Sequence, residues 1–375
     1  MYNSEKYIGD CLESILAQTF EDFEVIVVNN CSTDNSKKIV ESYIPKFYDR
    51  HKGGGIELKV TSTKYNSGNP GIPTNIGVRL SRGKYIFFVD SDDLITKTAL
   101  EEVYNLAEKF QADVVHTERF FAVPEDWKID DRREPKIVGA PIGEYVTEPT
   151  FITENFTERA ECLLNYQFDW APWLKLVRRD FLAEKNIQFV STKSTDLIFT
   201  CCIVCSAKKY LRVPNIVNIC RIREDSLSHK IETQAEKLIS KWIEAIVLGF
   251  NYVNEFLDGE EYFQKNLDAK YLVLETVVSD FSRYLFGLYT QIPAFQLDIL
   301  IQKEFAKYPN LTSLTTFIFS RMNIFNINLI QQQNLIRQQQ EQIQNLKVQN
   351  LQIQNQQNNF SQNVSYKKSS HKKKR

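Results

Sequence analysis

Short β-branched runs alternate with amphipathic helical patterns over residues 1–121, and this alternation constrains the fold more than any other feature. In chain order the helical (h) and strand-like (s) segments are 6–18 (h), 23–28 (s), a pattern around 39–44 (h), 56–62 (s), 72–81 (h), 85–89 (s), 96–110 (h) and 112–121 (s). Strands joined by crossover helices predict an α/β sandwich with a mainly parallel sheet. Ligands of such sheets bind beyond the carboxyl ends of the strands.

The rest of the chain changes character twice. A loop-rich, proline-containing stretch begins at residue 122, and helical patterns follow within 168–189 and from Asp196 onward, before a strand-like run at 216–224. Residues 231–325 are rich in Leu, Phe and Tyr and predict a helical C-terminal region. We therefore expect segment boundaries near residues 121, 228 and 328.

Residues 329–375 form a Gln/Asn-rich tail with a basic end. Six of ten heptad core positions between 329 and 360 are apolar, which predicts a weak coiled coil and a homo-oligomer, with Asn350 fixing the register. A disordered polar tail is the alternative. The final "KKSSHKKKR" is a solvated basic end that would also allow peripheral contact with anionic lipid at the inner face of a membrane.

Charge and composition exclude several classes of protein. The net charge of −1 divides into −8 for residues 1–330 and +7 for residues 331–375, and an acidic body is a poor surface for nucleic acid. No apolar run reaches the roughly 18 residues of a membrane helix. Seven cysteines without framework spacing suggest a reducing compartment, so we expect a cytoplasmic location. Cys201, Cys202 and Cys205 lie in an apolar helical run and are expected to be buried hydrophobes.

Three carboxylates crowd together directly after the strand-like run 85–89: Asp90, Asp92 and Asp93. Such neighbours repel one another unless a cation or a proton donor lies among them. Mg²⁺ and similar ions usually take one or two protein carboxylates and complete their coordination with substrate phosphates. Asp90 and Asp92, separated by Ser91, are therefore candidate metal ligands.

A short Asp-x-Asp pattern has a simpler explanation, an Asp-rich turn that also caps the helix near residue 96. The context favours a binding site, because a second polar segment, residues 29–34, also ends a buried strand. Both segments would lie at the edge of the sheet where ligands bind.

Four ordered motifs together resemble family 2 glycosyltransferases with a GT-A (nucleotide-diphospho-sugar transferase) fold. They are "MYNSEKYIGDCLESILAQTFEDFEVIVVNNCSTDNS", "NSGNPGIPTNIGVRLSRGKYIFFVDSDD", "WAPWLKLVRRDFLAEKNIQF" and "STDLIF". The resemblance covers residues 1–228. It implies an inverting transferase that uses a nucleotide-diphosphate sugar with Mg²⁺ or Mn²⁺, with a nucleotide-sugar half at 1–121 and an acceptor half at 122–228.

The resemblance also implies roles for individual residues on the donor side. Tyr2 would stack on the nucleotide base, and Asn29 and Asn30 would bond to the base and ribose. Asp90 would lie near the ribose and the metal, and Asp92 would bind the metal that bridges the diphosphate.

Further positions that match the family lie around the loop of acids. Asp93 would support this loop, and Ser91 within it would help to bind the nucleotide sugar. Thr74 stands where many relatives have an Arg that faces the nucleotide, so it too would lie at the nucleotide-sugar site. Arg221 and Arg223 would reach the diphosphate, although surface ion pairs with Glu224 or Asp225 would explain them equally well.

On the acceptor side, Asp196 matches the general base, which would take a proton from the attacking hydroxyl. Trp170, Trp173 and Lys175 lie where the family builds its acceptor site. Core packing is the simpler explanation for an isolated tryptophan.

The chain departs from the family pattern at four places. It begins at Met1-Tyr2, without the apolar strand that usually precedes this motif, so we expect a longer natural chain or a damaged one. Asn30 replaces an Asp, Thr74 replaces an Arg, and Thr195 replaces the acid before Asp196. Losing a charge-assisted hydrogen bond at Asn30 would cost roughly 1–2 kcal/mol.

These observations predict transfer of a sugar from a nucleotide-diphosphate sugar, with a UDP-sugar as the expected donor, to a hydroxyl group of a polysaccharide or lipid-linked glycan. A catalytically impaired binding or scaffold protein, or a gene relic, is the alternative. A dinucleotide-binding dehydrogenase is excluded because no GxGxxG follows a strand, and the absence of GxSxG and HExxH argues against hydrolases. Without QxxRW or membrane helices, one sugar per catalytic cycle is expected rather than chain extension.

Overall fold

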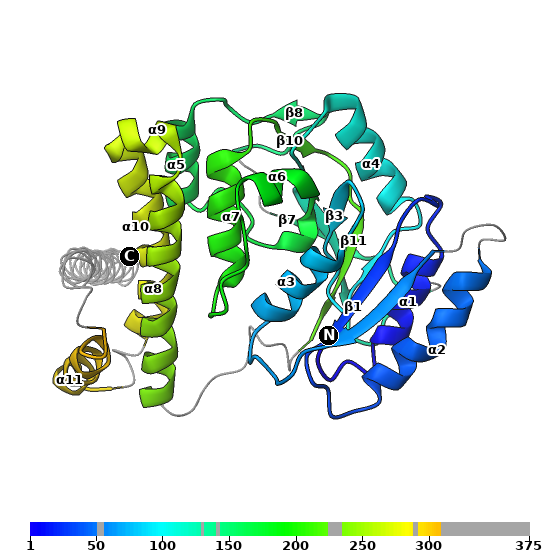
Figure 1. Ribbon diagram of the computed structural model, residues 1–375, viewed down its shortest axis with the longest axis horizontal. Coiled ribbons are helices and arrows are strands. Elements are labelled where there is room, and N and C mark those ends of the chain that lie inside the picture. Colours follow the sequence, from blue (N-terminus) through cyan, green and yellow to red (C-terminus); the bar gives the residue numbers. More distant parts are fainter. Residues whose placement is uncertain (51–55, 129–130, 140–142, 224–234, 288–291, 309–375) are drawn as a thin grey trace, which may run out of the picture. The chain divides into compact units, whose positions relative to one another are not determined.

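The alternation of helices and strands predicted for residues 1–121 is confirmed (Figure 1). The computed structural model describes residues 1–50, 56–128, 131–139, 143–223, 235–287 and 292–308. The first elements are α1 (Ile8–Leu16), β1 (Val25–Asn29), α2 (Ser36–Asp49), β2 (Leu58–Ser62), α3 (Gly71–Leu80), β3 (Tyr85–Phe87), β4 (Leu94–Ile95), α4 (Ala99–Phe110) and β5 (Val114–Thr117).

The remaining elements run from β6 to α11. In chain order they are β6 (Arg119–Pro124), β7 (Lys136–Gly139), β8 (Thr150–Phe151), α5 (Phe156–Leu164), η1 (Pro172–Leu174), β9 (Lys175–Arg178), α6 (Arg179–Glu184), α7 (Thr195–Ser206), β10 (Tyr210–Val213), β11 (Asn218–Ile222), α8 (Ala235–Asp258), α9 (Glu261–Lys265), α10 (Leu267–Gly287) and α11 (Ala294–Phe305).

The strands form mixed sheets rather than a mainly parallel one. Their orders are β1-β2, β3-β9-β5-β10-β8 and β4-β11-β6-β7. Among the described residues, β1-β2, β5-β10 and β6-β11 pair in parallel, and the other pairings are antiparallel. The α/β class is confirmed, but the predicted parallel character is wrong for most pairings, because β9 enters antiparallel between β3 and β5.

The core lies between these strands and the helices α1, α2 and α4. The apolar face predicted for the first helix is buried, with Ile8, Cys11, Leu12 and Ile15 at most 9% exposed. They share one hydrophobic cluster with residues of β2, β5 and β10. Close packing of this kind fixes where the strands end, and the candidate site lies at those ends.

Between residues 168 and 215 both predicted helices are present, but two strands were not predicted. The helix expected within 168–189 is the short α6, and the run "KLVR" before it forms β9, which pairs with β3 and β5 in the sheet. The helix that starts near Asp196 ends at Ser206, and "YLRV" forms β10.

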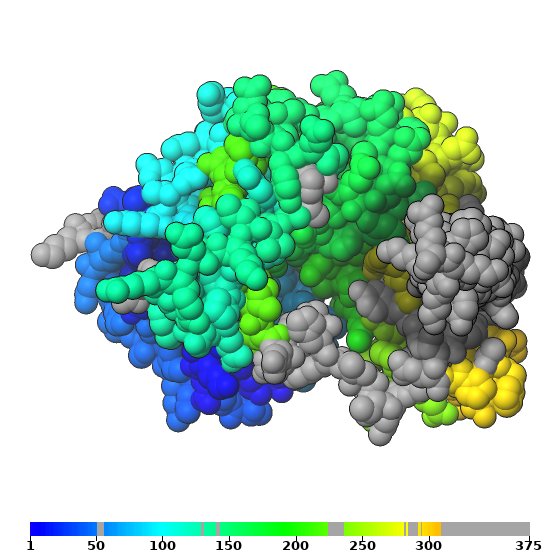
Figure 2. Space-filling model, turned by 180° about the vertical axis from the view of Figure 1, so that it is seen from behind, coloured from blue at the N-terminus to red at the C-terminus, as the bar shows by residue number. Residues whose placement is uncertain are grey.

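The helical C-terminal region is confirmed as far as residue 308. Helices α8 and α10 pack against each other, and α10 also packs against α5 (Figure 1). Seen from behind, the cyan-to-green part of the chain covers the centre of the face, and the yellow helical segment lies at one side (Figure 2). All seven cysteines are free, and Cys201, Cys202 and Cys205 are buried as predicted.

Residues Met1–Pro309 form one compact unit. The coiled coil predicted for 329–360 and the basic end lie outside the described residues. Within the described part of the chain, no helix is both long enough and apolar enough to span a bilayer.

Candidate active site

The loop of acids connects β3 to β4 and is tied to the start of α1. A turn closes the loop, with the Asp93 N–H donating to the Asp90 carbonyl at 3.1 Å. The hydroxyl groups of Ser91 and Ser4 lie 2.8 Å apart, and the Cys11 thiol donates to the Asp90 carbonyl at 3.6 Å. These contacts fix the loop from both sides.

The three carboxylates of the loop have different surroundings. Asp93 is buried and accepts a hydrogen bond from the Arg221 N–H at 2.9 Å, so it supports the loop. Asp90 is exposed, and Asp92 is half-buried. Asp90 and Asp92 are therefore the two acids of this loop that remain open to a ligand.

The pKa values of Asp90 and Asp93 are raised above the usual range. Displaced solvent and the charges of Asp93, Asp92 and Asp196 hold the pKa of Asp90 well above its usual range. Since Asp90 itself keeps contact with solvent, the three charges are the more important cause. Burial, together with the Asp92 charge, raises the pKa of Asp93 to about 7.

A divalent cation fits this loop. Asp90 and Asp92 offer hard oxygen ligands, and a cation between them would relieve the repulsion between their charges. Among the described residues no group of three or more His, Cys, Asp or Glu side chains could hold a metal. A bound ion would therefore need water and substrate phosphate oxygens to complete its coordination, which is usual for Mg²⁺.

The two arginines of β11 and its end contact this loop directly. The Arg221 guanidinium is buried and donates to the carboxylate of Asp10 at 2.8 Å and to the Asp92 carbonyl at 3.4 Å. Arg223 forms an ion pair with the Asp92 carboxylate at 2.6 Å. Among the described residues their carboxylate partners include Asp10 and Asp92. Glu224 and Asp225, the acids that the sequence suggested, lie outside the described residues.

The buried position of Arg221 leaves only Arg223 well placed for a diphosphate. The guanidinium groups of Arg221 and Arg223 lie 5.8 and 4.9 Å from the ring centroid of Tyr7, whose hydroxyl donates to Glu125. The cation–π contact with Tyr7 helps to hold Arg223 beside Asp92.

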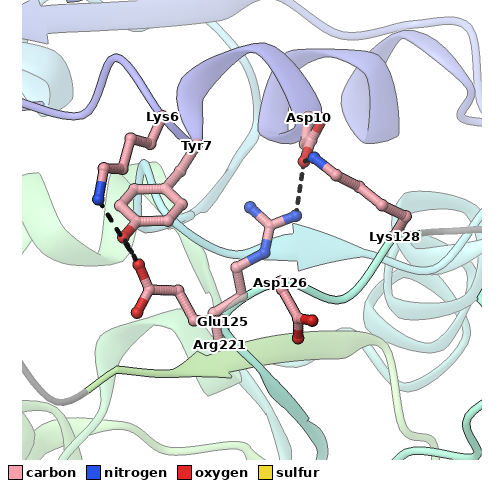
Figure 3. Close-up of a pocket in the computed structure, with 7 residues that line it drawn as sticks. All are labelled: Lys6, Tyr7, Asp10, Glu125, Asp126, Lys128 and Arg221. Atoms are coloured by element: carbon pink, nitrogen blue, oxygen red, sulfur yellow. Dashed lines mark hydrogen bonds and ion pairs between the residues drawn. The ribbon is translucent and has the colours of Figure 1, made fainter.

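A pocket of about 340 Å³ lies beside this arginine pair (Figure 3). Its lining residues are Lys6, Tyr7, Asp10, Glu125, Asp126, Lys128 and Arg221. Asp10 accepts from both Lys128, at 2.7 Å, and Arg221, and over the whole lining three acids balance three basic residues. Of these residues the sequence predicted only Arg221; the signal for the others was the spacing of Lys6, Tyr7 and Asp10 on one face of the predicted helix.

The residues predicted to bind the nucleotide lie at the end of β1. Met1 bonds to both Val28 and Asn30, and the adjacent Tyr2 is 46% exposed, as stacking on a base would require. Asn29 is buried and accepts from the Ser32 N–H at 3.0 Å. Thr74 is half-buried in the first turn of α3.

Both polar atoms of the Asn30 side chain form hydrogen bonds with the loop that follows β2. Its Oδ1 accepts from the Thr63 hydroxyl and from the Ser67 N–H, both at 3.1 Å, and from the Ser67 hydroxyl at 3.2 Å. Its Nδ2 donates to Asn66 at 3.2 Å. An Asp could not make this last bond, so Asn suits the local geometry.

Asp196 lies in the first turn of α7, where its charge acts on Asp90 across the sheet edge. Burial raises its pKa to about 6, partly opposed by the charge of Lys175 and reinforced by Asp169. A carboxyl with such a pKa is mostly ionised at neutral pH and is still a usable base. Thr195 is buried beside it, and its hydroxyl has no hydrogen-bond partner.

The residues predicted for the acceptor side divide into two kinds. Trp170 and Trp173 are half-buried and meet Tyr166 and Phe120 edge-on, with ring centroids 6.2 and 5.0 Å apart. Lys175, in contrast, is completely buried and cannot touch an acceptor. Its ammonium group donates to backbone carbonyls of the segment that carries the tryptophans.

Comparison with known proteins identifies curated relatives that act in polysaccharide biosynthesis. The poly(ribitol-phosphate) beta-N-acetylglucosaminyltransferase TarS of Staphylococcus aureus is 41% identical over 116 residues, which are 30% of this chain and 19% of TarS. The poly(ribitol-phosphate) beta-glucosyltransferase of Bacillus spizizenii is 40% identical over 116 residues, 30% of this chain and 17% of that protein. The match thus spans about a fifth of the length of these relatives.

A solved structure of S. aureus TarS 1–349 in complex with UDP-GlcNAc is also similar. Its TM-score is 0.49 at 24% sequence identity, covering 76% of this chain and 79% of that one. Residues 1–182 match the family described as glycosyl transferase family 2. This match covers 182 of the 375 residues and includes the loop of acids, the end of β1 and the tryptophan segment, so residues 1–182 are a glycosyl transferase family 2 region.

Proposed function

We propose that this chain is an inverting hexosyltransferase that moves one sugar from a nucleotide-diphosphate sugar, most simply a UDP-sugar, to a hydroxyl group of a polysaccharide or lipid-linked glycan. The observation that carries this proposal is the electrostatic contact between Asp90 and Asp196, which come from segments about a hundred residues apart. It supports a metal-diphosphate side and a base side that face one crevice. TarS and its Bacillus relative, which by name transfer sugars to poly(ribitol-phosphate), support the choice of acceptor class.

In this proposal Asp90 and Asp92 hold Mg²⁺ or Mn²⁺ together with the donor diphosphate. The ion, when bound, stabilises the negative charge that develops on the leaving nucleotide diphosphate. Arg223, which already pairs with Asp92, would offer its guanidinium to the same phosphates. Tyr2 would stack on the base.

Asp196 performs the proton transfer. The acceptor oxygen attacks the anomeric carbon while its proton moves to the Asp196 carboxylate. The bond between the anomeric carbon and the phosphate oxygen breaks, and its electron pair leaves with the nucleotide diphosphate. Attack from the face opposite the leaving group inverts the anomeric configuration.

The test is release of nucleoside diphosphate from a panel of UDP- and GDP-sugars with Mn²⁺, in the presence of poly(ribitol-phosphate) or other glycan acceptors. We expect turnover with at least one donor and its loss in Asp92→Asn and Asp196→Asn. Donor binding by calorimetry without turnover in the wild-type chain would favour the impaired, transferase-like binding protein instead. Absence of both binding and turnover would refute the proposal.

A further inference from the structure

The two tryptophans of the acceptor half lie on a segment, residues 169–174, in which every backbone carbonyl accepts a hydrogen bond. This segment contains only the short helix η1, so regular secondary structure cannot supply most of the donors. Lys175 Nζ donates to the carbonyls of Asp169 at 2.7 Å and Ala171 at 2.8 Å. Its backbone N–H donates to the Pro172 carbonyl.

Side chains from three other elements supply the remaining donors. Thr200 of α7 donates to the Trp170 carbonyl at 3.0 Å, and Asn218 of β11 donates to the Trp173 carbonyl at 2.7 Å. Thr117 of β5 donates to the Leu174 carbonyl at 3.1 Å. Because each bond comes from a different part of the fold, the segment cannot shift without breaking several of them at once.

Burying Lys175, which supplies more of these hydrogen bonds than any other residue, lowers the stability of the fold. Lys175 is 0% exposed, and burial lowers the pKa of its ammonium group to about 8. A buried lysine is rare, and a chain that needed only a filled core would use an apolar side chain here. This loss of stability is explained if the position of the carbonyls, and hence of the tryptophans, matters for function.

The same network connects the tryptophans to the base. Thr200 follows Asp196 by four residues on α7, so the two side chains lie on the same face of this helix. Lys175 also lies near enough to Asp196 for its charge to lower the pKa of that carboxyl. The other charged groups that act on this region are Asp169 and Asp90.

We infer that residues 169–174 form a preorganised platform for a sugar ring of the acceptor, and that Lys175 is its positioning residue. This inference rests on the proposed function. Trp170 and Trp173 present half-buried indoles, and Lys175 and Thr200 hold their backbone at a fixed distance from Asp196. The occupant is a saccharide unit whose hydroxyl must reach this base.

The platform itself is tested by hydrogen–deuterium exchange of the full chain. Lys175→Met removes two of the donors, and Thr200→Val removes one without changing charge or size. We expect both to speed exchange at Ala171, Trp173 and Leu174 at least tenfold, with peptides of β1 and β2 unchanged. Lys185→Met is the matched control, because Lys185 is an ordered lysine paired with Glu260 away from the platform. Unchanged exchange in Thr200→Val would overturn the inference even if Lys175→Met fails to fold.

Kinetics then test the role in catalysis, with UDP-GlcNAc, Mn²⁺ and a ribitol-phosphate oligomer as probes. Both variants should raise the acceptor KM about tenfold and leave the Kd of UDP within twofold. Only Lys175→Met should move the acidic limb of the kcat profile to higher pH, because it also removes a positive charge beside Asp196. A change in donor affinity alone would refute the positioning role. Altered exchange in the variants of a chain that turns over no donor would leave the platform standing and refute the proposed function instead.

Discussion

Replacing Asp196 by Asn should make the protein less active and more stable. Burial raises the pKa of this carboxyl from about 3.8 to about 6, so the fold disfavours its charged form. A shift of about two units corresponds to about 3 kcal/mol, since each pH unit is worth 1.36 kcal/mol. Two features of Asp196 reduce this figure: the side chain keeps some contact with solvent, and it lies in the first turn of α7, where a helix favours negative charge. We therefore expect Asp196→Asn to raise the free energy of unfolding by about 1–2 kcal/mol.

The pH dependence of this gain has a defined sign. An acid with a raised pKa destabilises the fold above that pKa, and the penalty disappears as pH falls towards the pKa of the unfolded chain. The advantage of Asp196→Asn should therefore be complete above about pH 6 and fall to about one third at pH 4.5. In the same variant kcat should drop at least about a hundredfold, because the general base is lost.

Thermal unfolding of metal-free protein at pH 7.5 and 4.5 measures the first effect, and nucleoside diphosphate release measures the second. Asp180→Asn is a matched control, because Asp180 also lies in the first turn of a helix but is exposed. It should change neither quantity appreciably. An Asp196→Asn protein that is no more stable at pH 7.5, or whose gain does not shrink at pH 4.5, would refute the reasoning.

Three further changes probe the donor side. Asp92→Asn, or chelation of divalent ions with EDTA, should abolish UDP binding measured by calorimetry, whereas retained binding would contradict the metal assignment. Arg223→Gln should weaken UDP binding about tenfold, because a guanidinium that could bind the phosphates is lost. The same change should strengthen the binding of Mn²⁺ alone, because Arg223 no longer competes with the ion for the Asp92 carboxylate. Weaker binding of both UDP and Mn²⁺ would contradict this competition. Asn30→Asp should lower the free energy of unfolding by about 1–2 kcal/mol, because the bond to Asn66 is lost. An unchanged melting temperature would show that Asn66 adapts.

Local sequence patterns predicted the helices and strands of residues 1–121 well, because these patterns depend only on residues that are close together in the sequence. The face of α1 and the strand that ends at the loop of acids follow from spacing alone. The run "KLVR" does not: its residues read equally well as a helix, and only pairing with β3 and β5 decides for a strand. The mixed sheet order has the same cause, since strand direction is set by partners that lie far away in the chain.

Contacts made through backbone atoms were also invisible in the sequence. Lys175 was expected to line the acceptor side, but its ammonium group lies inside the protein and donates to carbonyl oxygens. Arg221 and Arg223 were expected near the diphosphate, yet nothing in the sequence indicates that both lie near the ring of Tyr7 or that Arg221 pairs with Asp10. Side chains that bind backbone have no complementary residue type that a pattern could reveal.

Three acids of the site differ from the surface carboxylates in the direction of their pKa shifts. At the surface, carboxylates such as Glu13 and Asp131 have neighbouring cations that lower their pKa values. In the site the pKa values of Asp90, Asp93 and Asp196 are raised, even with Arg221, Arg223 and Lys175 close by. A chain selected only for stability would remove such charges, because each costs free energy in the folded state. Their persistence is best explained if a cationic ligand and a transferable proton complete the site during turnover.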